Sequence, residues 1–131
     1  MDFCVDWTLF VKVSTSQKCE RIIDTVQKAL GISFSQVTKD RYWKDKSLFK
    51  VDAKSCVTAP ATKDAFYAIM TAANGLARRW VVNGPTEGGI WEFAGTAEKS
   101  SIRIQGIESI DFRSASNIEL AGYGSPTSRA G

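Results

Sequence analysis

Residues 7–31, WTLFVKVSTSQKCERIIDTVQKALG, most constrain what this chain can fold into, because a strand-like pattern passes directly into a helix-like one. The first part, residues 7–13, is rich in β-branched and aromatic side chains, which are favoured in strands. Alternation places Leu9 and Val11 on one face and Phe10 on the other. We therefore predict an interior strand over 7–13.

The second part of this stretch carries the signals of a helix start, a helix face and a helix end. Ser14 and Gln17 have the spacing of a capping box, in which both side chains satisfy free backbone N–H groups. Gly31 suits the left-handed conformation that ends many helices. Between them, apolar residues recur every three or four positions, as on one face of a helix: Cys19, Ile22, Ile23, Val26, Ala29 and Leu30. We predict a helix over 16–30.

Strand and helix patterns continue along the chain. Apolar alternation predicts strands over 32–38 and 48–57, joined by a polar hairpin loop, and a further apolar repeat predicts a helix over 63–79. Gly75 costs about 1 kcal/mol inside a helix, so an earlier helix end is the alternative.

The C-terminal part turns to strands separated by turn-rich segments. Strands are predicted over 80–83, 90–96 and 102–112. Gly106 interrupts the alternation of the last strand, which indicates a β-bulge.

The resulting order, β-α-β-β-α-β followed by further strands, is the plan of ferredoxin-like folds, in which two helices cover one face of an antiparallel sheet. We predict a single α+β domain over residues 1–113 with an extra C-terminal hairpin, and a loosely ordered tail over 114–131. Sheets of this kind can pair edge to edge or face to face, so a homodimer is one expected assembly.

Composition bounds the class of protein. The chain has 131 residues, three cysteines, no histidine and a net charge of +3. This length suits one domain that folds without disulfides or metals. Cys4, Cys19 and Cys56 form no CxxC pair, which predicts reduced thiols and fits a cytoplasmic protein. The sequence shows no secretory signal and no apolar run of membrane length, so we expect a soluble protein that does not bind membranes.

The lack of histidine excludes imidazole-based catalytic triads and the usual histidine-containing metal shells. Glu92, Glu108 and Asp111 remain as candidates for acid-base chemistry. Such residues are common on exposed sheet faces, so we expect them to face solvent. No catalytic residue, metal site or cofactor is predicted, and an enzyme that uses a carboxylate pair is the third alternative for function.

The polar segment between the second and third predicted strands carries two aromatic rings flanked by cations. Exposed aromatics beside guanidinium and ammonium groups can stack on bases or anchor a protein interface. The alternative is that one of the rings packs back onto its own domain. The predicted partner-binding residues are Arg41, Tyr42, Trp43, Lys44 and Lys46.

One resemblance rests on the first strand. Leu9, Phe10 and Val11, followed by a helix in a βαββαβ order, resemble the first-strand motif of RNA-recognition (RRM) domains. The third predicted strand lacks the glycine-spaced aromatic motif of that family. The resemblance implies a face that binds single-stranded RNA, with Phe10 stacking on a base. The residues of this alternative face are Phe10, Lys12, Lys50 and Lys54.

A second resemblance is one of type. A small, histidine-free domain that ends in a tryptophan-rich hairpin, with Trp80 and Trp91, resembles the small bacterial immunity proteins that neutralise a cognate toxin. This resemblance implies a non-enzymatic protein inhibitor that occludes the active site of its toxin. Such an inhibitor is our leading expectation, and single-stranded nucleic-acid binding is the alternative.

Overall fold

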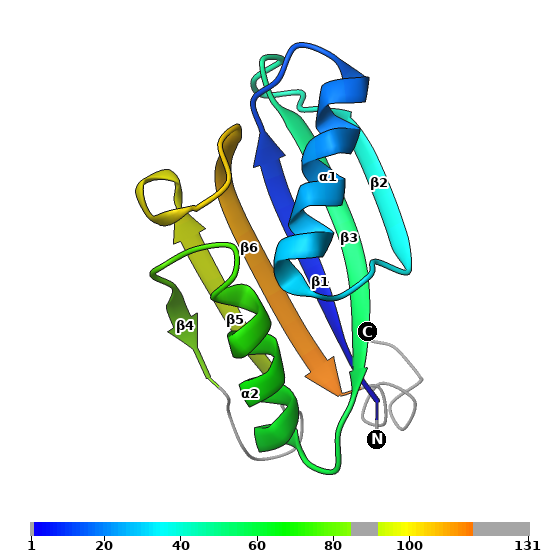
Figure 1. The fold of residues 1–131 in the computed structure, drawn as a ribbon, viewed down its shortest axis with the longest axis vertical. Helices are drawn as coiled ribbons and strands as arrows, with labels where there is room; N and C mark the ends of the chain where they lie inside the picture. Colours follow the sequence, from blue (N-terminus) through cyan, green and yellow to red (C-terminus); the bar gives the residue numbers. More distant parts are fainter. Residues whose placement is uncertain (1, 85–91, 117–131) are drawn as a thin grey trace.

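A computed structural model describes residues 2–84 and 92–116 (Figure 1). Within these residues, six strands form one antiparallel sheet and two helices lie against one of its faces. The predicted α+β class is confirmed. The elements in chain order are β1 (Asp2–Val11), α1 (Ser16–Leu30), β2 (Gln36–Arg41), β3 (Phe49–Thr58), α2 (Thr62–Ala73), β4 (Val81–Asn83), β5 (Glu92–Glu98), the short 3₁₀ turn η1 (Lys99–Ser101) and β6 (Ile107–Ser116).

The strand order differs from the simple plan predicted from the sequence. The sheet runs β2-β3-β1-β6-β5-β4, so β1 lies between β3 and β6 and is antiparallel to both. In the predicted β-α-β-β-α-β plan, residues 80–83 are the fourth strand of the core sheet and the later strands form an extra hairpin. Instead β6 lies beside β1, because it carries the buried residues Ile110 and Phe112, while the short and largely exposed β4 pairs with β5 at the edge.

The hydrophobic core lies between the sheet and the two helices. Every second residue of β1 from Phe3 to Val11 is at most 1% exposed, which confirms the predicted faces of this strand. Trp7 lies at the centre of the core, where its ring centroid is 5.2 Å from that of Phe112 and its indole N–H donates to Ser55 Oγ at 2.9 Å. The one buried polar group of this large side chain therefore has a partner.

The first helix spans 16–30 as predicted, with a different cap. Thr15, not Ser14, is the N-cap residue, and its hydroxyl accepts a hydrogen bond from the backbone N–H of Lys18 at 3.1 Å. Two neighbouring hydroxyl residues gave the sequence pattern a one-residue ambiguity. Gly31 ends the helix at φ 71°, as predicted, and donates to the carbonyl of Gln27.

The second helix ends at Ala73, six residues before the predicted end at 79. The earlier end is the alternative that Gly75 raised, and a Cβ atom at this position would collide with the backbone carbonyl oxygen of Ala29 in α1. The glycine therefore permits a close approach between the two helical regions. Beyond it, Ala77 pairs with Ile102 as an isolated bridge.

Two predicted strands begin later than the sequence pattern suggested. Ile32 and Phe34 pack on the core from the connection after α1, and the paired strand β2 begins only at residue 36. The last strand begins at residue 107, not 102. Apolar residues in these segments reflect core packing and not strand pairing.

The predicted bulge near Gly106 is confirmed. Phe10 pairs with Ser109 and Val11 pairs with Ile107, so Glu108 is the extra residue of β6. Gly106 itself has φ 100°, a conformation that L side chains rarely adopt. β6 continues to residue 116, so residues 114–116 of the predicted tail belong to the sheet, and residues 117–131 lie outside the described part of the chain.

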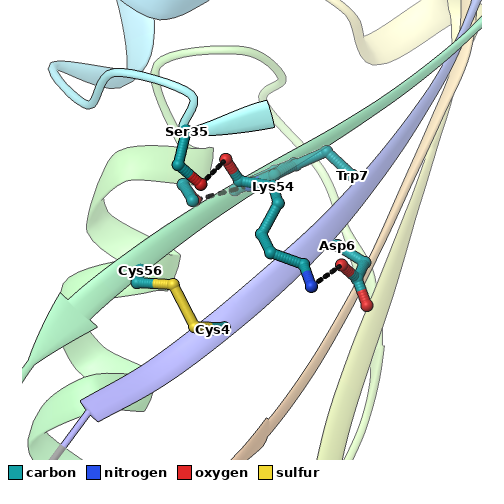
Figure 2. A network of polar contacts seen from close by, with 7 residues as sticks. Cys4, Asp6, Trp7, Ser35, Lys54 and Cys56 are labelled. Atoms are coloured by element: carbon teal, nitrogen blue, oxygen red, sulfur yellow. Dashed lines mark hydrogen bonds and ion pairs between the residues drawn. A yellow bond between two sulfur atoms is a disulfide. The ribbon is translucent and has the colours of Figure 1, made fainter. Parts of the chain in front are cut away.

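A disulfide joins Cys4 of β1 to Cys56 of β3 (Figure 2). The two residues are directly opposite in the register, with Cα atoms 4.0 Å apart. The prediction of reduced thiols is wrong for this pair, because strand register and not chain spacing brings them together. Cys19 is free and buried, as predicted. Disulfides persist mainly in oxidising compartments, so the cysteines no longer support the cytoplasmic location, which stays a prediction.

Neither helix within the described residues is long and apolar enough to cross a membrane.

Candidate functional site

The predicted nucleic-acid face and the predicted partner-binding loop meet at one end of the open sheet face, which is the face without helices. Phe10 lies on this face in β1, and the hairpin loop between β2 and β3 brings Tyr42 against it. The ring centroids are 4.9 Å apart and the planes meet at 66°, an edge-to-face arrangement. Trp43 follows, with its ring centroid 6.2 Å from that of Tyr42.

Lysine residues accompany these rings along the loop and the two neighbouring strands. The Nζ atom of Lys44 lies 5.1 Å from the ring centroid of Trp43, within cation–π range. Lys50 is directly opposite Phe10 in the β1–β3 register. We call this surface the aromatic-lysine patch, and its residues are Phe10, Lys12, Tyr42, Trp43, Lys44, Lys46 and Lys50.

The loop that carries Trp43 is closed by its own hydrogen bonds. The backbone N–H of Tyr42 donates to the carbonyl of Leu48 at 2.9 Å, and the N–H of Leu48 donates to the carbonyl of Asp45 at 3.0 Å. These bonds hold the backbone of the loop in one conformation. A preorganised loop loses little conformational entropy when it binds a partner.

Asp45 stabilises the same loop through its carboxylate. One oxygen accepts hydrogen bonds from the hydroxyl of Ser47 at 2.7 Å and from the backbone N–H of Ser47 at 3.0 Å. These two bonds, together with the nearby charge of Lys12, lower the pKa of Asp45. This supporting role of Asp45 was not predicted from the sequence, although an Asp side chain commonly accepts a hydrogen bond from the backbone two residues further on in a turn.

Arg41 supports the patch and does not extend from it. Its guanidinium donates to the carbonyl oxygens of Val13 at 3.4 Å, Ser14 at 2.6 Å and Lys46 at 3.1 Å, and it lies 4.1 Å from the ring centroid of Phe49. The side chain thus ties the loop to the connection between β1 and α1. The structure places this predicted partner-binding residue in a structural position.

Lys54 lies outside the patch. Its Nζ atom is 4.0 Å from Asp6 Oδ1, on the part of the open face near the disulfide (Figure 2). Phe10, Lys12 and Lys50 are the three residues of the predicted nucleic-acid face that join the aromatic loop.

Tyr42 and Trp43 differ in how far their rings are exposed to solvent. Tyr42 is half-buried against Phe10, as the alternative of a ring packing onto its own domain expected. Trp43 is 78% exposed. Tyr67 on α2 is comparably exposed at 74%, and it has no ring or cation contact within the part of the chain that the structure describes. Trp43 is therefore an exposed ring within an organised surface, whereas Tyr67 is an isolated one.

The centre of the open face consists of polar groups that bond to one another. The hydroxyl of Thr8 donates to Asp52 Oδ1 at 3.0 Å, and the hydroxyl of Thr96 donates to Asp111 Oδ1 at 2.7 Å. These groups already have partners within the chain. Among residues 2–84 and 92–116, no ion pair engages the lysines of the aromatic-lysine patch, which also offers apolar area.

Two of the three candidate acid-base residues have partners of their own in the described structure. Glu108 forms an ion pair with Lys99 at 3.1 Å, and Asp111 accepts from Thr96. The side chain of Glu92 lies outside the described residues, so the carboxylate-pair alternative is untested.

Neither cysteine chemistry nor metal chemistry gains support from the described part of the chain. Burial raises the pKa of Cys19, which disfavours the nucleophilic thiolate. Residues 2–84 and 92–116 contain no group of three or more His, Cys, Asp or Glu residues that could hold a metal ion.

Comparisons with protein-family models, curated proteins and solved structures found no match to this chain.

Proposed function

We propose that this chain is a non-enzymatic binding protein that holds a protein partner through the aromatic-lysine patch. The observation that carries the proposal is Trp43, a 78% exposed indole on a loop closed by hydrogen bonds. Tryptophan is enriched among the few residues that supply most of the energy of protein interfaces. An exposed tryptophan on a hydrogen-bonded loop, with a lysine in cation–π range, suits the centre of such an interface.

The charge of the patch indicates the chemistry of the partner. Lys12, Lys44, Lys46 and Lys50 contribute four cations against two nearby carboxylates, those of Asp45 in the loop and of Asp40 opposite Lys50, so the local charge is positive. Complementary charge favours an acidic partner surface and raises the association rate at low salt. In its narrowest form, the proposal is a bacterial immunity protein that covers the active site of a toxin with an acidic surface.

Affinity capture from the source organism tests this function. Tagged parent protein should retain one protein in stoichiometric amount through a salt wash. Trp43→Ala should weaken that complex by at least about 2 kcal/mol, roughly 30-fold in Kd, because it removes the central anchor. Tyr67→Ala is the matched control, since it removes an equally exposed ring outside the patch. Failure to recover a protein partner, or equal weakening by both variants, would contradict the proposal.

A second candidate function, single-stranded nucleic-acid binding, is favoured by one observation. Phe10 lies opposite Lys50 and two residues before Lys12, with two further rings beside it. Rings and cations in this arrangement can stack on bases and contact phosphates. Four phosphate contacts would give a slope near −3 in a plot of log K against log salt, about a 50-fold loss from 50 to 200 mM salt. Undetectable or salt-insensitive binding of a labelled single-stranded RNA would remove this candidate.

A further inference from the structure

A hollow of about 760 Å³ lies between α1 and β2, away from the aromatic-lysine patch. β2 is the outermost strand on this side of the sheet, and Figure 1 shows no element beyond it. Ile23 of α1 and Val37 of β2 form the apolar part of the hollow. Val37 is 41% exposed, although its side chain points toward the helix layer.

The free edge of β2 also offers backbone groups. The backbone N–H of Tyr42 donates to the carbonyl of Leu48. In the register of β2 with β3, the even-numbered residues of β2 therefore direct their backbone N–H and C=O groups toward β3. Alternate residues of an antiparallel strand turn their N–H and C=O groups to opposite sides. Val37 and Lys39 therefore direct their backbone groups away from β3, and the register of β2 with β3 is uninterrupted. An extended chain would find backbone partners and a side-chain hollow at the same edge.

The lining of the hollow carries more acidic than basic side chains. Glu20, Asp24 and Asp40 line the hollow together with a single cation, Lys39, and Glu20 is bound to Lys39 at 3.2 Å. Asp24 on the helix and Asp40 on the other side of the edge have no ion-pair partner within the described residues. A segment that carries lysine or arginine side chains would complement these two carboxylates.

We infer that the edge of β2 is a second docking site, which takes an extended basic segment of a protein partner as an added strand. Apolar side chains of this segment lie over Ile23 and Val37 on the helix side, and its alternating cations lie on the opposite face, toward Asp40. A second copy of β2 is a poorer occupant, because its own cations are engaged within its chain: Lys39 binds Glu20 and Arg41 binds three carbonyl oxygens. The inference does not depend on the function proposed for the aromatic-lysine patch.

Amide hydrogen exchange with a synthetic peptide tests the inference. The probe is a capped peptide of about seven residues that alternates valine and lysine, and the control alternates valine and glutamate. Saturation with the lysine peptide should slow exchange at Val37 and Lys39 at least tenfold, because their outward N–H groups become bonded. The glutamate peptide should leave both rates unchanged. Unchanged rates with the lysine peptide, or equal protection by both peptides, overturn the inference.

Two variants separate strand addition from other binding. Val37→Pro removes one outward N–H without removing a donor to β3, and it should weaken the lysine peptide at least tenfold. Val37→Thr keeps the N–H and should bind within threefold of the parent. If the proline variant does not fold, Asp40→Lys on the exposed edge strand should also weaken binding at least tenfold, because it removes the carboxylate that faces the lysines of the peptide. Parent-like affinity in the folded variants overturns the inference, as does a dimer that excludes the peptide from this edge.

Discussion

Loss of the Cys4–Cys56 disulfide should lower the free energy of unfolding by roughly 4 kcal/mol. The bond closes a chain segment with a sequence separation of 52. Under the chain-entropy relation, cross-linking a loop of this length removes entropy from the unfolded chain that is equivalent to about 4 kcal/mol at 25 °C. The folded state should change little, because β1 and β3 remain paired on both sides of the two positions.

Urea unfolding of the oxidised parent and of the Cys4→Ser/Cys56→Ser variant measures this effect. With an m-value of about 1.5 kcal/mol/M, the midpoint should fall by about 2.7 M. A reducing agent should lower the midpoint of the parent and leave the double variant unchanged. Thiol titration of the denatured, oxidised parent should detect Cys19 alone. Three reactive thiols, or a loss below about 1 kcal/mol, would refute the assigned bond and the entropy argument respectively.

Three further predictions concern the core, and urea unfolding measures each. Trp7→Phe should cost about 2 kcal/mol, because the buried Ser55 hydroxyl loses its donor, and the cost should be smaller in a Ser55→Ala background. Gly95→Ala should cost about 1–3 kcal/mol, because a Cβ atom there would lie 2.6 Å from the Cζ atom of the packed Phe112 ring; a parent-like midpoint would contradict this close fit. Burial raises the pKa of the Cys19 thiol above its ordinary value of 9.0. The stability that the buried, protonated thiol contributes is therefore fully present below pH 9.0, and it is lost as the pH rises through the pKa of the folded state. Cys19→Ala should remove this part of the alkaline loss.

The strand and helix at residues 7–31 could be predicted from the sequence because their signals are local. The alternation in β1 marks its buried face, and the apolar repeat with Gly31 marks the face and end of α1. The cap was misplaced by one residue, since Ser14 and Thr15 both carry a hydroxyl that can accept a backbone N–H. Local chemistry defines these elements well and their exact boundary less well.

Features that depend on strand order and register could not be read from local patterns. β2 is a charged edge strand, and the apolar signal before it comes from Ile32 and Phe34, which pack on the core. The disulfide requires that Cys4 and Cys56 stand opposite each other, which only the pairing of β1 with β3 determines. Long-range pairing also places β6 beside β1, where the sequence plan expected an earlier strand.

Part of the candidate site was accessible from the sequence and part was not. The loop around Trp43 was predicted as an exposed aromatic cluster because cations flank its rings. The contact between Phe10 and Tyr42 was not predicted, since these residues lie in different predicted sites and meet only when the β2–β3 hairpin folds over the end of β1. The structural role of Arg41 likewise depends on carbonyl groups supplied by the connection between β1 and α1.

The affinity of the captured partner for Trp43→Ala, measured beside Tyr67→Ala by titration calorimetry, tests the central claim most directly. Both variants remove an exposed ring, at 78% and 74% exposure, but only Trp43 belongs to the aromatic-lysine patch. If Trp43 anchors the partner, the affinity should fall by about 30-fold or more for Trp43→Ala and by less than about twofold for Tyr67→Ala. Unchanged affinity in a correctly folded Trp43→Ala protein would show that the partner binds elsewhere.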